Sequence, residues 1–331
     1  MILRAFSSNR PVLLLALPVL AGALAWPLLV SGPIPTMASQ YRVDRMLEGQ
    51  WFAGAPLIIS LVCLLLGSIQ VNRLFNRHEF HDSPTYIPSL IYFVSGIGLL
   101  FLQFSPSVYI ANLFVILGLH PLLSVYRQQR VLSEYFRAGL GMGMAALIFP
   151  PYTSLLAALW VCIIYTRAFN WREHLLSLIG FGIPFLYWVS YAYYTGTYNN
   201  IVLFHLEFGV DKANGWLHEG WVTRAFVISL ALSFLLALPR YLFLSQRSTN
   251  KARNVKTVFF ILGIGLISSI FTSHTFSGKW LISGWMLPLA IVSGYWYTNY
   301  RYSLVAPVVF YLSLFTATLL CLQHAGVLTF F

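Results

Sequence analysis

Two acidic residues, Asp44 and Glu48, and two arginines, Arg42 and Arg45, lie in the segment SQYRVDRMLEGQ (residues 39–50), between two long apolar runs. A carboxylate can accept the proton of an attacking hydroxyl, and a guanidinium can bind a phosphate through two hydrogen bonds. The two acids are four residues apart and would share one side of a helix. These residue types are those needed to transfer a group from a phosphate-linked donor, with the acids as catalytic residues and the arginines as substrate ligands.

Two further polar segments contain side chains of the same kinds. In residues 197–222, the candidate substrate ligands are His205, Asp211, Lys212 and His218. In SHTFSGKWLISGW (residues 273–285), they are His274 and Lys279, at the ends of adjacent apolar runs that we expect to be joined by a tight turn containing Gly278. The simpler alternative is that these charges are solvated loop residues, or that Lys279 extends to the lipid headgroups.

The elements that must position these residues follow from composition. The chain has 58% hydrophobic and only 9% charged residues, with a mean hydropathy of +0.74. Soluble domains carry about 25% charged residues. We therefore expect an all-α, polytopic membrane protein. The net charge of +11 comes from basic residues spread over short connectors, so no nucleic-acid partner is expected.

Apolar runs of roughly 20 residues predict about eleven transmembrane helices in a single transmembrane domain, residues 1–331. The first run is too long for a signal-peptide core and is expected to remain as a span. The runs lie near residues 12–31, 52–71, 86–103, 107–124, 138–149, 151–166, 174–195, 223–243, 257–274, 280–298 and 304–323.

The stretch 138–166 decides the count, because it is long for one helix and short for two. Pro150 and Pro151 at its middle interrupt helical hydrogen bonding and favour a helical hairpin. With two helices and a cytoplasmic N-terminus, most basic residues lie inside, as the positive-inside rule requires. The exceptions among the 20 lysines and arginines are Arg42, Arg45, Lys212, Arg224 and Lys279. The loops 32–51 and 197–222 then both lie outside.

No metal site is predicted from sequence spacing. His78, Glu79, His81 and Asp82 cluster in NRHEFHDSP, but they do not form the H-E-x-x-H pattern of zinc proteases. The aromatic stretch YWVSYAYYTGTY (187–198) is typical of membrane-interface anchors, and a platform for stacking a sugar is the functional alternative.

The order of these features resembles the GT-C class of polyprenyl-phosphate-sugar glycosyltransferases. The resemblance is carried by the acidic first outer loop, by AGLGMGMAALIFPPYTSLLAALW followed by RAFNWREHLLSLIGFGIPFLYWVSYAYYTG, and by GKWLISGWMLPLAIVSGYW. It implies a GT-C-like helix arrangement, a polyprenyl-phosphate sugar as lipid substrate, and Asp44 as general base or ligand of a divalent cation. The chain departs from that class in lacking an Asp-Glu or Asp-x-Asp pair in this loop and a large C-terminal outer domain. It is also similar to a family of bacterial multi-pass inner-membrane proteins, which implies location in the bacterial inner membrane.

Two other functions are consistent with the sequence. The protein could be a non-catalytic membrane component of an envelope assembly or secretion machine, with its outer loops docking other membrane proteins. It could also be a lipid or solute transporter, for which a polar path would need residues such as Asn112, His120, Ser268 and Ser269.

Overall fold

The computed structural model describes residues 6, 14–30, 55–78, 80, 84–102, 105–125, 131–167, 169–196, 220–246, 250–269, 278–298 and 305–324. These residues form eleven α-helices and a short 3-10 helix, η2 (Pro150–Ser154). The α-helices are α2 (Ala16–Val30), α4 (Ala55–Arg77), α5 (Ile87–Leu102), α6 (Pro106–Ser124), α7 (Leu132–Ile148), α8 (Leu155–Thr166), α9 (Trp171–Tyr194), α10 (Trp221–Gln246), α11 (Asn250–Ser268), α12 (Gly278–Thr298) and α13 (Val305–His324).

The chain is a helical membrane protein. Among the described residues, five helices are long and apolar enough to cross a membrane: α4, α6, α9, residues Trp221–Phe243 of α10 and Val305–Gln323 of α13. Residues Ile87–Phe101 and Pro150–Thr166 are apolar but shorter. Each of the eleven α-helices overlaps one of the predicted apolar runs, so the all-α prediction is confirmed.

The helix ends differ from the predicted runs where charged residues begin. The helix α4 continues to Arg77 rather than stopping near residue 71, α7 starts at Leu132 rather than 138, and α11 starts at Asn250 rather than 257. An apolar run marks only the part of a helix that lies in hydrocarbon. Arginine and lysine stems can extend from a helix toward the headgroups, so the helix itself continues beyond the run.

The break inside 138–166 is where the proline pair predicts it. Phe149 has an extended backbone (φ −128°, ψ 91°), and the two prolines open the 3-10 helix that leads into α8. Tyr152 closes the turn by donating its N–H to Phe149 O at 3.0 Å. The prediction of two helices in this stretch is confirmed.

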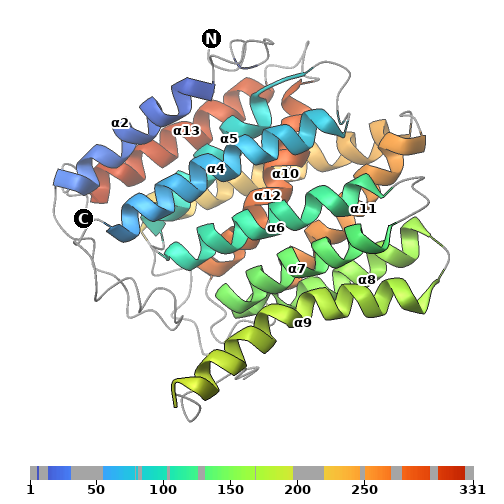
Figure 1. The fold of residues 1–331 in the computed structure, drawn as a ribbon. Coiled ribbons are helices and arrows are strands. Elements are labelled where there is room, and N and C mark those ends of the chain that lie inside the picture. The colour runs from blue at the N-terminus through green and yellow to red at the C-terminus, as the bar shows by residue number, and fades with distance from the viewer. Residues whose placement is uncertain are drawn as a thin grey trace.

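The most enclosed helix is α5, which is buried at every residue from Ile87 to Phe101. It packs against α4, α12 and α13. A helix that is apolar all round is suited to such a position. The α6 helix is tied to it by Tyr109, whose hydroxyl donates to Gly96 O at 2.9 Å. Figure 1 shows α2 and α13 on one side of the bundle and α8 and α9 on the other, with the last turns of α9 projecting beyond the neighbouring helices.

Candidate functional site

Most of the predicted site lies outside the described residues. This applies to the catalytic pair Asp44 and Glu48 and to the substrate ligands Arg42, Arg45, His205, Asp211, Lys212, His218 and His274. Lys279 is described only as backbone, in the first turn of α12, so Gly278 begins a helix rather than forming the expected turn. The site can therefore be built from the helices that lead into these segments.

The helices α9 and α10 fix both ends of the segment 197–219. The helix α9 ends at Tyr194, and Gly196, with φ +68°, donates its N–H to Tyr193 O at 3.2 Å. Glycine adopts this left-handed backbone without the penalty that a Cβ brings, so it is a common helix terminator. The described chain resumes at Gly220, and α10 begins at Trp221, two residues before the predicted run.

A tight seam joins α7 to α9. Gly139 and Gly143, one turn apart on α7, face the backbone of Ser177 and Phe181 on α9, and Gly180 of α9 faces the backbone of Phe136. In each case an added Cβ would overlap backbone atoms. Small residues in such positions allow membrane helices to approach closely.

The opposite side of α7 packs on α6 in the same way. Gly141 lies between Gly139 and Gly143 in sequence and therefore points away from α9. A Cβ on Gly141 would lie 2.7 Å from Gly118 Cα on α6. The glycines of the sequence GLGMG (residues 139–143) thus allow α7 to pack closely on α9 with one side and on α6 with the other.

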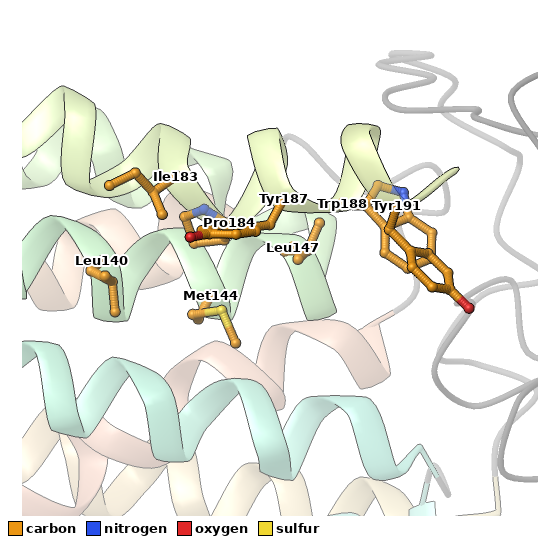
Figure 2. A pocket seen from close by; sticks show the side chains of 8 residues that line it. All are labelled: Leu140, Met144, Leu147, Ile183, Pro184, Tyr187, Trp188 and Tyr191. Carbon is orange, nitrogen blue, oxygen red and sulfur yellow. The ribbon is translucent and has the colours of Figure 1, made fainter. Parts of the chain in front are cut away.

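Beyond the seam, α7 and α9 enclose an apolar groove with a cavity volume of about 480 Å³. Figure 2 shows residues of α9 along one wall and residues of α7 along the other. The lining residues are Leu140, Met144, Leu147, Ile183, Pro184, Tyr187, Trp188 and Tyr191. The groove follows α9 toward the end from which residues 197–219 continue. Three of the residues that line the groove, Tyr187, Trp188 and Tyr191, belong to the aromatic stretch 187–198, which was interpreted above as membrane anchors or as a platform for stacking a sugar.

Two buried polar contacts of one side chain, Asn112 of α6, join α6 to η2 and to α12. Tyr152 donates its hydroxyl to Asn112 Oδ1 at 2.6 Å, and Asn112 Nδ2 lies 3.7 Å from Met286 Sδ. The side chain of Asn112, which was considered above for a transport path, thus contacts Tyr152 and Met286 inside the helix bundle. Ser268 and Ser269 likewise donate to carbonyls of their own helix, Gly265 O and Leu266 O.

Three buried or partly buried charges were not singled out from the sequence. Glu173 is buried at the start of α9, with Oε1 3.3 Å from Arg167 Nη1. Lys256 is buried on α11, with Nζ 4.5 Å from the ring centroid of Tyr295. Arg224, in the first turn of α10, has an enclosed Nε that makes no hydrogen bond.

A comparison of the chain with known protein families, curated proteins and solved structures finds no match. No group of three His, Cys, Asp or Glu side chains suited to hold a metal ion occurs among the described residues. The residues proposed by resemblance as ligands of a divalent cation, Asp44 and Glu48, lie outside that part of the chain.

Proposed function

We propose that this protein is a membrane glycosyltransferase that moves a sugar from a polyprenyl-phosphate donor to a cell-envelope acceptor. Its site would lie on the outer face of the bacterial inner membrane, between the loops 32–51 and 197–222. The eleven helices would then all be spans, with a cytoplasmic N-terminus.

The observation that supports this proposal best is the groove between α7 and α9. It is lined by aliphatic and aromatic side chains and belongs to helices of a membrane domain, so an apolar chain from the bilayer is its natural occupant. The groove continues toward the segment that carries His205, Asp211, Lys212 and His218. A lipid chain held there would bring its phosphate toward the end of α9 from which this segment continues.

In the proposed reaction, an acceptor hydroxyl attacks the anomeric carbon of the lipid-linked sugar. A bond forms between that oxygen and the carbon, and the bond between the carbon and the phosphate oxygen breaks, releasing polyprenyl phosphate. Asp44, assisted by Glu48, takes the acceptor proton directly or holds a divalent cation. Arg42, Arg45, Lys212, His274 and Lys279 would bind the phosphate, whose negative charge increases as it leaves.

The test is mass spectrometry of lipids retained by the gently purified full-length protein. Leu147→Trp adds bulk inside the groove, and Leu186→Trp adds the same bulk to a side chain of α9 that is 65% exposed and does not line the groove. We expect the wild-type protein, Asp44→Asn and Leu186→Trp to retain a polyprenyl phosphate or its sugar adduct, and Leu147→Trp to lose it. Bulk phospholipid alone in all four samples would contradict the proposal.

The second candidate, a component of an envelope assembly machine, is favoured by the projecting end of α9. Its side chains Tyr193 and Tyr194 are strongly exposed, and such aromatic faces are common at protein interfaces. This function predicts a stoichiometric membrane-protein partner in the same purified samples, lost on Tyr194→Ala and unaffected by Asp44→Asn.

A further inference from the structure

Three basic side chains gather where α4 and α6 end. Arg73 and Arg77 are one turn apart on α4, and both are exposed. The helices α4 and α6 pack together and lie side by side in Figure 1. His120 lies in the last turns of α6, the helix that packs against α4.

None of the three has a counter-ion among the described residues. The two ion pairs found there involve other arginines, Arg137 and Arg167. Both ring nitrogens of His120 are enclosed and make no hydrogen bond in the structure. These nitrogens are closed to a ligand at the surface, so the two exposed arginines are the donors that a phosphate would meet. Two guanidinium groups with no carboxylate partner among the described residues form a donor set suited to phosphate.

An apolar stripe on α4 leads directly to the arginines. Ile58, Val62 and Leu66 are 44–48% exposed. At 3.6 residues per turn, these three residues and the two arginines fall within an arc of about 100° on one side of the helix. An acyl chain can lie along this stripe while its headgroup phosphate meets the arginines at the membrane surface.

We propose that Arg73 and Arg77 form a binding site for a phosphate group, supplied by the headgroup of an anionic phospholipid. The predicted orientation places this site at the cytoplasmic surface, across the membrane from the proposed catalytic loops. It therefore binds a resident lipid and not the glycosyl donor, and it does not depend on the proposed function. Basic residues near a membrane surface each contribute about 1 kcal/mol of attraction to anionic lipid.

The test is native mass spectrometry of the full-length protein, titrated with phosphatidylglycerol or with phosphatidylcholine of the same acyl chains. We expect wild type to prefer phosphatidylglycerol and the double variant Arg73→Gln/Arg77→Gln to bind it about tenfold or more weakly, from the loss of two such charges. The control is Arg137→Gln, which removes an exposed arginine on the same predicted face that is already 3.5 Å from Glu134.

The outcomes separate the sources of the phosphate. Retained phosphatidylglycerol that excess inorganic phosphate does not displace supports the lipid headgroup as the source. Complete displacement by inorganic phosphate assigns the site to free phosphate instead. Equal weakening by Arg137→Gln and by the double variant, or equal binding of both lipids to wild type, would overturn the site. Because Arg73 and Arg77 are exposed, their replacement leaves the packing intact, which an unchanged melting temperature would verify.

Discussion

Two glycines of α9, Gly180 and Gly182, lie two residues apart but in different surroundings. At Gly180, an added Cβ would lie 3.1 Å from Leu140 N and 3.2 Å from Phe136 C, and closer still to Phe136 O. At Gly182, nothing lies within 4 Å of the added atom. The change Gly180→Ala therefore adds a methyl group inside the seam with α7, and Gly182→Ala adds the same group to open space.

The expected difference follows from what each neighbour can do. Carbon atoms pack best at about 3.5–4.0 Å, and the atoms that Gly180 faces belong to a helix backbone that cannot rotate away. The helices must move apart along the seam, and overpacking of this kind costs about 1–3 kcal/mol. Alanine favours a helix over glycine by about 1 kcal/mol at both positions. We therefore expect Gly182→Ala to be neutral or slightly stabilising, and Gly180→Ala to be less stable than Gly182→Ala by about 1–3 kcal/mol.

The assay is thermal unfolding of both variants in one detergent, followed by size-exclusion chromatography of the soluble fraction. For a chain of 331 residues, the free-energy difference corresponds to melting temperatures about 1–4 °C apart. Equal melting temperatures, or a more stable Gly180→Ala, would refute the seam. Because the groove begins where the seam ends, Gly180→Ala should also change lipid retention, whereas Gly182→Ala should not.

Three further predictions test single contacts. Arg167→Gln leaves the buried carboxylate of Glu173 without its cation and should lower the free energy of unfolding by about 1–3 kcal/mol, since the arginine is partly solvated. Adding Glu173→Gln should recover most of this loss. A double variant as unstable as the single one would contradict the pairing. Tyr152→Phe removes the 2.6 Å hydrogen bond between the buried side chains of Tyr152 and Asn112 and should lower the free energy of unfolding by about 1 kcal/mol or more. An unchanged melting temperature would show that this hydrogen bond does not stabilise the fold. Asp44→Asn should abolish sugar transfer to the envelope acceptor in a complementation assay, and full activity in this variant would remove Asp44 from the catalytic role.

The order of the helices among the described residues could be predicted because apolar length and proline breaks act locally. The proline pair at 150–151 ends one helix and starts the next through its effect on the local backbone. The helix ends at Arg77, Leu132 and Asn250 could not be predicted, because charged residues occur both in the end turns of helices and in the connectors between them.

The groove could not be predicted because it depends on which helices are neighbours. The sequence places α8 between α7 and α9, yet α7 packs directly on α9 through glycine-to-backbone contacts. Glycines at 139, 141 and 143 indicate close approach but not the partner on each side. The charged loops of the candidate site were found from residue types alone, and their placement stays a prediction.

The burial of α5 has a consequence for how the protein is made. Its enclosing partners α12 and α13 follow it by more than half the chain, so they are synthesised long after α5 has left the ribosome. At 5–20 residues per second, the interval between Leu102 and Gly278 lasts roughly 10–35 s. During that time, α5 can meet only lipid, the earlier helices or the insertion machinery. Quality control that recognises a half-assembled bundle would therefore act within this window, and a ribosome stalled before Gly278 would leave a product marked for degradation.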